Sequence, residues 1–307
     1  MANKYALPPG VQVIERGWLS ANMVIATGPY NAAVIDSGYC THSAQTVALV
    51  QAALADAPLN YLLNTHLHSD HCGGNAALQA NYPLVQTLIP PGHASAIKDW
   101  DPVTLSHVPT GQQCPRFVYQ GLLIPGQEIQ LGEHTWQIHA APGHDPNAVI
   151  LFESVSRTLI SADALWENGF GVVFPELEGD DAFEAVGATL NLIAQLAPIT
   201  VIPGHGRVFP YSETVLERAR TRLDAFAANP IKHARHAAKV LLKFKLLEVQ
   251  QQDIQVFRDW ALGTPYFELV RSRFFASVPA FDWLDTLIDE LQHSGAARRE
   301  GTDLVNA

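Results

Sequence analysis

Cysteine is scarce in this 307-residue chain, and long apolar runs are absent. The three cysteines, Cys40, Cys72 and Cys114, form neither a CxxC motif nor an even set, which favours a reducing compartment over a disulfide-stabilised secreted protein. No stretch approaches the roughly 18 apolar residues of a membrane-spanning helix. The first ten residues also lack the basic and then apolar pattern of a secretory signal. We therefore expect a cytoplasmic protein with no membrane partner.

Basic residues are scarce over the first two thirds of the chain. Residues 1–211 hold 6 Lys and Arg against 17 Asp and Glu, whereas residues 212–307 hold 13 of each, so the first segment carries the formal net charge of −11. Binding of a polyanion needs a broad basic surface, which this segment lacks. We therefore expect a small-molecule substrate rather than nucleic acid, and we predict no particular oligomeric state.

What the chain does have, over its first 210 residues, is an alternation of short apolar segments with amphipathic ones. Residues 42–56 and 180–197 show helical periodicity, and the segments between and around them have the pattern of buried or half-buried strands. Strands interleaved with helices predict a layered α/β fold. The predicted strands are residues 22–28, 31–38, 61–66, 135–141, 148–154, 158–163 and 199–206.

The pattern changes near residue 211. Residues 212–307 show helical periodicity alone: Asn229 and Pro230 break the first helix, residues 231–248 form the second, and Thr264 with Pro265 starts another. The chain therefore divides into a catalytic domain, residues 1–211, and a helical C-terminal domain, residues 212–307. Residues 294–307 are polar, and we expect them to be disordered.

The strongest functional signal is the segment THLHSDHCGG, residues 65–74, which follows an apolar strand directly. Four potential metal ligands fall within six residues, where a loop can turn them toward one point. His66 and His68 alternate and suit one ion, whereas Asp70 and His71 can reach a second. The two glycines allow the backbone to turn tightly into the next helix.

This segment resembles the signature of the metallo-β-lactamase-fold superfamily, whose members are αββα sandwiches. The other ligand positions of that family match His144 after one strand, Asp163 at the end of another, and His205 after a third. The resemblance covers about residues 10–210. It implies a four-layer αββα metallo-β-lactamase sandwich, here followed by an all-helical C-terminal domain.

The resemblance also implies a metal centre and a reaction. Two transition-metal ions are expected, zinc before iron or manganese, with Asp163 bridging them. A hydroxide shared by the two ions would attack an ester or thioester carbonyl, and Asp70 would orient it while binding the second ion. Asp70 and Asp163 are thus the expected catalytic residues. The implied metal ligands are His66, His68, Asp70, His71, His144, Asp163 and His205.

Several family activities remain open on these residues. Acylglutathione hydrolases of the glyoxalase II type have a helical C-terminal domain of comparable length, but their basic substrate-binding motif has no match here. β-Lactamase-like endoribonucleases and thioesterases with a small winged-helix-like tail fit the layout about as well, so an endoribonuclease or phosphodiesterase is an alternative. Persulfide dioxygenases share the seven residues yet use a single iron. True β-lactamases lack the bridging aspartate and are disfavoured.

Two departures from the family pattern concern neighbours of the ligands. Ser161 and Ala162 replace the usual Thr-Gly before the bridging aspartate, and Asp145 follows His144. Asp145 could either support a metal-binding histidine or cap the local turn. Cys72 lies inside the motif, but the ligand set is complete without it, so we interpret it as a buried packing residue.

Apolar and basic residues outside the motif suggest substrate contacts. Trp166, Phe170 and Phe174 lie on a glycine-containing loop after the bridging aspartate, and we predict that they bind an apolar substrate group, with residues 90–125 as an opposite wall. One C-terminal helix is basic and is either a solvated face or a contact for an anionic substrate. Its basic residues are Lys232, Arg235, Lys239, Lys243 and Lys245.

Overall fold

The computed structural model describes residues 7–55 and 57–307. Its first sheet has the strand order β1-β2-β3-β4-β5-β6, antiparallel from β1 to β3 and parallel from β3 to β6. The short helix α2 and the helices α1, α3 and α4 connect its strands. The bounds of the strands are β1 Val11–Ile14, β2 Met23–Ala26, β3 Ala33–Ile35, β4 Tyr61–Leu63, β5 Gln86–Ile89 and β6 Gly121–Leu122. The helices are α1 Ser43–Leu54, α2 Ser69–Cys72, α3 Asn75–Asn81 and α4 Ala94–Asp99, with 3-10 turns at η1 Cys40–His42 and η2 Pro91–His93.

The second sheet has the order β12-β11-β10-β9-β8-β7 and is antiparallel except between β10 and β11. Its strands are β7 Glu128–Leu131, β8 His134–Ala140, β9 Val149–Glu153, β10 Thr158–Ala162, β11 Thr200–Pro203 and β12 Phe209–Pro210. The helices that follow its strands are α5 Phe174–Glu178, α6 Ala182–Leu196 and α7 Glu213–Ala227.

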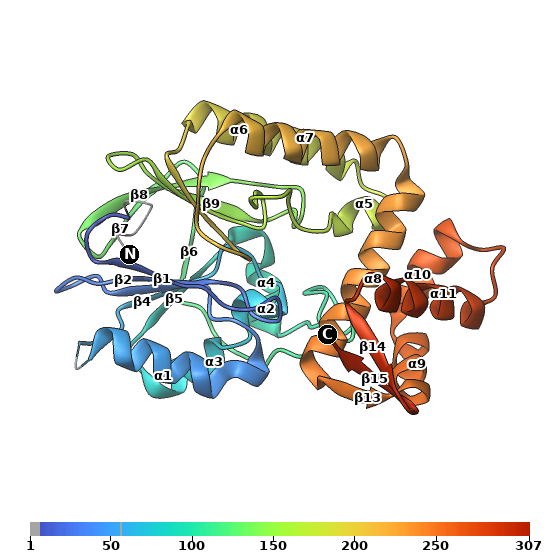
Figure 1. Ribbon diagram of the computed structural model, residues 1–307. Helices are drawn as coiled ribbons and strands as arrows, with labels where there is room; N and C mark the ends of the chain where they lie inside the picture. Colours follow the sequence, from blue (N-terminus) through green and yellow to red (C-terminus); the bar gives the residue numbers. More distant parts are fainter. Residues whose placement is uncertain (1–6, 56) are drawn as a thin grey trace.

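The two sheets stack face to face, with α1 and α3 outside the first and α6 and α7 outside the second (Figure 1). Both faces of each sheet are therefore covered, which explains why β9 and β10 are buried throughout. Leu63, Trp136 and Ile160 belong to the apolar core between the sheets. The predicted αββα sandwich is confirmed.

A second body follows at the C-terminus, beside the sandwich (Figure 1). The prediction of a helical region is confirmed from Pro230 onward. Its long helix α8 also packs against α7. α7 packs with α6 in the apolar core of the second sheet, so the chain leaves the sandwich only after α7. The helices of this body are α8 Pro230–Val249, α9 Ile254–Gly263, α10 Pro265–Phe274 and α11 Ala280–His293.

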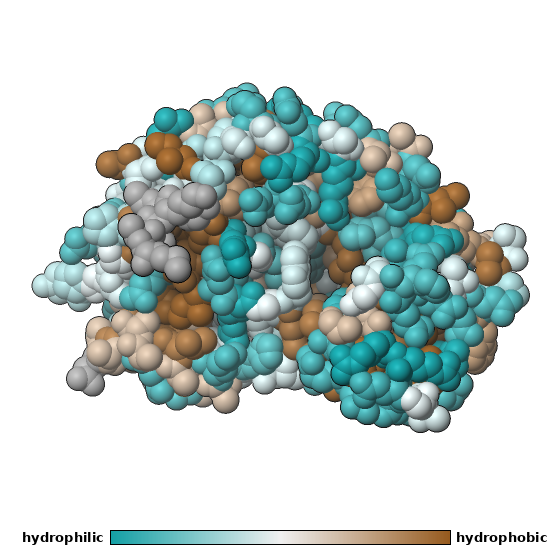
Figure 2. Space-filling model, viewed as in Figure 1, coloured by the Kyte–Doolittle hydropathy of each residue, from teal (hydrophilic) through white to brown (hydrophobic). Residues whose placement is uncertain are grey.

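This second body is not built from helices alone, and its polar tail is ordered. A three-stranded antiparallel sheet, order β13-β15-β14, was missed by the sequence analysis. Its surface is hydrophilic (Figure 2) because three of the four residues of β14 face solvent, while Leu304 of β15 is fully buried. The strands are β13 Gln251–Asp253, β14 Ala297–Glu300 and β15 Asp303–Asn306.

None of the helices in the described part of the chain combines the length and the apolar character that crossing a bilayer requires.

Candidate metal centre

The histidine-rich motif begins in the loop after the parallel strand β4, which holds His66 and His68, and continues through α2, which holds Asp70 and His71. Gly73 and Gly74 are required after it, because the backbone passes very close to the loop that follows β3. A Cβ atom at Gly73 would lie 2.5 Å from the Cys40 nitrogen, and one at Gly74 would lie 2.4 Å from the Ser37 carbonyl oxygen. This close approach holds the motif against the edge of the first sheet.

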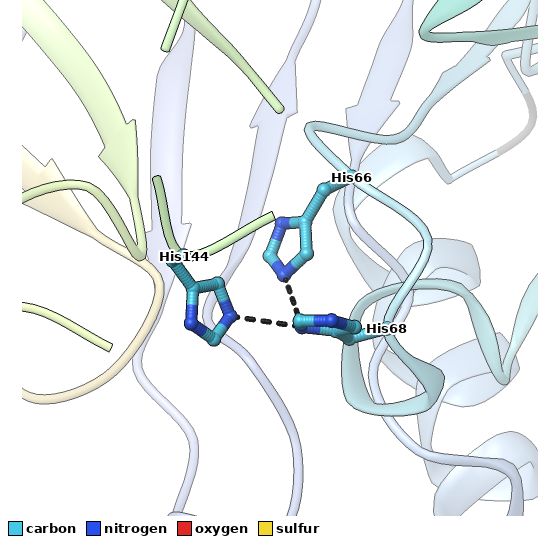
Figure 3. Close-up of side chains that lie close together, drawn as sticks. All are labelled: His66, His68 and His144. Carbon is cyan, nitrogen blue, oxygen red and sulfur yellow. Dashed lines mark hydrogen bonds between the residues drawn. The ribbon is translucent and has the colours of Figure 1, made fainter. Parts of the chain in front are cut away.

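His66, His68 and His144 point their rings toward one another (Figure 3). The His66 Nε2 lies 3.1 Å from His68 Nδ1, which lies 2.8 Å from His144 Nε2. The His144 Nδ1 donates a hydrogen bond to the Val172 carbonyl, so its Nε2 carries the lone pair. Burial, together with the neighbouring histidines, holds the pKa of both His66 and His68 well below the ordinary value, so these rings are neutral. Neutral imidazole rings that converge in this way could hold a metal ion between them.

A second group adjoins the first and consists of Asp70, His71 and His205. The His205 Nε2 lies 3.1 Å from Asp70 Oδ2. The His71 Nδ1 donates to Asp36 Oδ2 at 2.8 Å, which leaves its Nε2 facing Asp163 Oδ1 at 3.5 Å. Burial alone would lower the pKa of His71, but Asp36, Asp163 and Asp70 outweigh it and raise that pKa well above the ordinary value. A metal ion would take the place of the proton that these carboxylates retain.

Asp163 lies between the two groups. Its Oδ2 is 3.4 Å from His144 Nε2 and 3.8 Å from His205 Nε2, and its Oδ1 faces His71. Burial would raise the pKa of this carboxyl, but the rings of His205 and His71 outweigh it and hold the pKa well below its usual range. The carboxylate is therefore ionised and within reach of both groups, as a bridging ligand must be.

Local backbone geometry aims Asp163 at this position. The register between β10 and β11 shifts between Ile160 and Ala162, and Ala162 has φ +45°. Such an irregularity at a strand end redirects the next side chain. A Cβ atom at Gly204 would lie 2.1 Å from Asp163 Oδ1, so only glycine leaves room for the carboxylate there.

The donor set fits first-row transition metals such as zinc, which prefer imidazole and carboxylate ligands. Three groups are each compact enough for one ion: His66 with His68 and His144, Asp70 with His71 and His205, and His66 with His71 and Asp163. The structure thus brings together all seven residues that the sequence analysis proposed as ligands.

Sequence reasoning missed two residues of the centre. Asp36 follows β3 and accepts hydrogen bonds from the Thr65 nitrogen and hydroxyl, at 2.9 and 2.8 Å, as well as from His71. Trp18 stacks on the His205 ring, with 5.4 Å between centroids and 10° between planes. The only sequence signal for Asp36 was its place at the end of an apolar strand, and Trp18 gave none.

A cavity of about 420 Å³ lies beside the seven candidate ligands, which together are called the metal cluster below. Its lining includes His68, Asp70, His144, Asp163 and His205 from the cluster. Ser106, Thr110 and Gln112 come from the stretch expected to form a wall, and Val240, Leu241 and Phe244 come from α8.

Of the three aromatic residues predicted to contact substrate, Trp166 and Phe174 line this cavity. The Trp166 Nε1 also donates to Asp163 Oδ1 at 3.2 Å. Phe170 requires a correction, because it is 1% exposed and packs in the core with Leu165 and Val173. Its ring turns inward and supports the wall from behind.

The two neighbours of the ligands left open by the sequence have defined contacts. Asp145 is buried, with Oδ1 accepting from the Asn147 nitrogen at 2.7 Å and Oδ2 at 3.9 Å from His68 Nε2. It therefore fixes the local turn and faces a ligand without a direct hydrogen bond. Cys72 is fully buried in an apolar cluster, as expected of a packing residue.

The basic residues of α8 are largely engaged within the second body. Arg235 and Lys239 both pair with Glu290. The Lys243 Nζ donates to the carbonyls of Ala296 and Ala307 and to the side chain of Asn306. Lys245 pairs with Glu248 and Lys232 is exposed. These contacts leave no continuous basic strip on α8.

Comparisons with known proteins agree with this geometry. The family model described as the metallo-beta-lactamase superfamily matches residues 16–205. A hydroxyacylglutathione hydrolase from a Nostoc species is 25% identical over 71% of this chain and 75% of its own length. One from Brucella anthropi is 24% identical over 61% of this chain and 60% of its own length. A metallo-beta-lactamase family protein from Thermus thermophilus shares the fold over 98% of this chain and all of its own, with a TM-score of 0.58 and 17% identity.

Proposed function

This chain belongs to the metallo-beta-lactamase superfamily and is a metal-dependent hydrolase, and we propose that it cleaves an ester or thioester bond using two metal ions. The observation that carries this proposal is the convergence of seven potential metal ligands in one cluster, five of which line a single cavity. His66, His68 and His144 would hold one ion, Asp70, His71 and His205 the other, and Asp163 would bridge them. Zinc is the ion that this donor set suits best.

Bound dications would lower the pKa of coordinated water and polarise the acyl oxygen of a substrate. The chain's own residues set the geometry for that chemistry. The Asp70 carboxylate lines the cavity and faces His205 through Oδ2, while its Oδ1 makes no hydrogen bond within the described residues. That free oxygen is placed to orient a water and to accept its proton. Trp166 holds Asp163 through its indole nitrogen, so the carboxylate keeps one orientation.

The proposed substrate is a small molecule with an apolar acyl group. The cavity also has apolar lining residues, which suit an acyl chain rather than a sugar or a phosphate: Val172, Phe174, Val240, Leu241 and Phe244. The curated relatives named hydroxyacylglutathione hydrolase support a thioester. Free cysteines support a cytoplasmic location.

We further propose that, within residues 212–307, the part from Pro230 onward acts as a substrate-binding domain of the winged-helix-like kind. The order helix, strand, helices and terminal hairpin supports this assignment. The nuclease alternative would need cationic side chains facing outward, whereas Lys239 and Lys243 are held by internal contacts and α11 presents Asp282, Asp285 and Asp289. The iron dioxygenase alternative uses the same seven residues, so metal content and oxygen consumption distinguish it from a hydrolase.

A substrate panel tests the proposed activity. The zinc-loaded protein should hydrolyse aliphatic thioesters and esters with modest dependence on salt, and Asp163→Ala should abolish turnover while leaving the fold intact. Circular dichroism and the unfolding midpoint would control for the fold, and Cys72→Ser should keep both metal and turnover. Efficient cleavage of single-stranded RNA, lost in a Lys239→Ala, Lys243→Ala double variant, with every acyl substrate inert, would reject the proposal.

A further inference from the structure

A second hollow continues from the catalytic cavity along α8. It has a volume of about 370 Å³, and it shares Trp18, His236, Val240 and Phe244 with the catalytic cavity as common walls. Beyond these it is lined by further residues of α8 and by Leu291 of α11. Because the two hollows share four lining residues, they adjoin along α8.

The face of α8 that lines this groove is apolar and follows helical spacing. His236, Val240 and Phe244 recur every four residues, and Leu247 extends the stripe toward Leu291 of α11. The stretch from His236 to Leu247 measures about 16 Å at the α-helical rise of roughly 1.5 Å per residue. Trp18 is 55% exposed and Val240 36% exposed, so apolar surface faces water at the entrance.

The lysines at the edge of the groove do not make it an anion site. The Lys239 ammonium pairs with Glu290 at 2.9 Å, and Lys243 donates to three oxygens near the C-terminus. His236 accepts a hydrogen bond from Arg222 at 2.8 Å, and burial together with that charge lowers its pKa to about 3, so the ring is neutral. The groove therefore selects for hydrocarbon rather than for charge.

We propose that this groove binds the distal part of a long, unbranched acyl chain whose carbonyl lies at the metal cluster. The proposal rests on the proposed ester or thioester hydrolysis and specifies its substrate class. At about 1.2 Å per bond of extended chain, the 16 Å groove accommodates on the order of a dozen carbons. The C-terminal body would then select acyl chains by length, which assigns it a role in specificity.

Chain-length preference tests this proposal. Butanoyl and dodecanoyl thioesters of N-acetylcysteamine carry the same uncharged leaving thiol, so only the acyl chain differs. We expect kcat/KM to be at least about tenfold higher for the dodecanoyl compound, the effect of roughly two buried methylenes. Leu247→Trp, which fills the far end of the groove, should lower this preference at least about tenfold, mainly through KM.

Ile231→Trp is the matched control, since Ile231 lies on the same helix and is 52% exposed outside the groove. It should leave the preference unchanged. Equal rates for the two chain lengths in the wild-type protein, or equal effects of Leu247→Trp on both, would overturn the proposal. A change in oligomeric state in Leu247→Trp without a change in preference would overturn it too, and would make the groove an interface between copies.

Direct binding of sodium dodecanoate below its micellar concentration separates this proposal from the proposed function. If no thioester is hydrolysed but dodecanoate binds, and Leu247→Trp weakens that binding while Ile231→Trp does not, the groove is an acyl site and the reaction is wrong. If thioesters are hydrolysed but dodecanoate binds no better than butanoate, the reaction stands and the groove assignment fails.

Discussion

Asp36 shows how a side chain that reaches no proposed ion can govern the metal centre. Its carboxylate fixes the His71 tautomer by accepting from Nδ1, and it holds the backbone at Thr65, where the motif begins. Asp36 itself adopts φ +58°, a conformation that asparagine tolerates better than alanine. Partners of this kind raise the basicity of metal-binding histidines and fix their orientation.

Replacing Asp36 with asparagine isolates the contribution of its charge. Asp36→Asn keeps the backbone conformation and one acceptor oxygen, but it removes the negative charge beside His71. We expect the affinity for the second ion to fall by about 10- to 100-fold, as measured by competition with a chromophoric chelator. Unchanged affinity, with the variant folded, would mean that Asp36 serves only the backbone.

Substitutions of Trp166 and Phe174 should change different kinetic constants, although both residues line the cavity. Trp166→Phe removes the hydrogen bond to Asp163, so we expect a lower kcat. The Phe174 ring packs against His68 and His144 but has no hydrogen bond to them, so for Phe174→Ala we expect a higher KM with kcat nearly kept. Steady-state kinetics on one thioester would separate the two, and the reverse pattern would contradict these roles.

At this scale the sequence predicted which seven residues cluster, because four of them are neighbours in one motif and the others follow strands. It did not predict Asp36, whose partners lie 29 and 35 residues away, or Trp18, whose partner His205 is far along the chain. Phe170 was misplaced because a loop sequence does not show which of its aromatic side chains turns inward.

Helix α8 connects the two bodies through two neutral histidines. The His233 Nε2 accepts from the Val173 nitrogen at 3.2 Å, next to the cavity wall, and the His236 Nε2 accepts from Arg222. Burial, followed by the charge of Arg222, lowers the pKa of His233 to about 4. Both hydrogen bonds need an unprotonated ring, so these histidines bind a proton less readily in the folded protein than in the unfolded chain.

Stability should therefore fall on acidification below the ordinary histidine pKa. The unfolded chain takes up a proton near pH 6.5 and the folded chain only near pH 4, so the contribution is complete above about pH 7 and is lost as the pH falls toward 4. For His233 the full loss amounts to about 3 kcal/mol at 1.36 kcal/mol per pKa unit, of which about 2 kcal/mol falls between pH 7.5 and 5. Urea unfolding at about pH 7.5 and 5, in wild type and His233→Gln, would measure that part.

The informative quantity is the difference between wild type and His233→Gln in how the free energy of unfolding changes with pH, because the metal ligands titrate in both proteins. We expect His233→Gln to show the smaller loss of stability on acidification. An identical pH dependence in wild type and variant would contradict the neutral assignment of this histidine.

The C-terminal sheet marks the limit of prediction for whole elements. The tail was expected to be disordered because β14 is polar, with a single buried residue, Ala297. Its order comes from pairing with β15, whose Leu304 and Val305 are buried, and from β13 on the other side. A short edge strand of this kind has no periodicity that a local pattern could reveal.

For the molecule as a whole, the sandwich supplies the metal ligands and the C-terminal body supplies much of the apolar wall. The sandwich was predicted from the family resemblance of the motif and from the strand pattern. The strands could be recognised because both faces of each sheet are covered, which makes them nearly continuous apolar segments. The contribution of α8 to the cavity could not be predicted, since it depends on how the two bodies pack. That packing places Val240 and Phe244 in the lining of the same cavity as His68 and Asp163.

The central claim is a two-ion centre that performs hydrolysis, and metal content measured together with turnover tests it most directly. The purified protein should contain close to two transition-metal ions per chain and hydrolyse an aliphatic thioester. Chelation should remove both ions and the activity, and zinc should restore both. A single tightly bound iron, with oxygen consumed in place of thioester hydrolysis, would contradict the account.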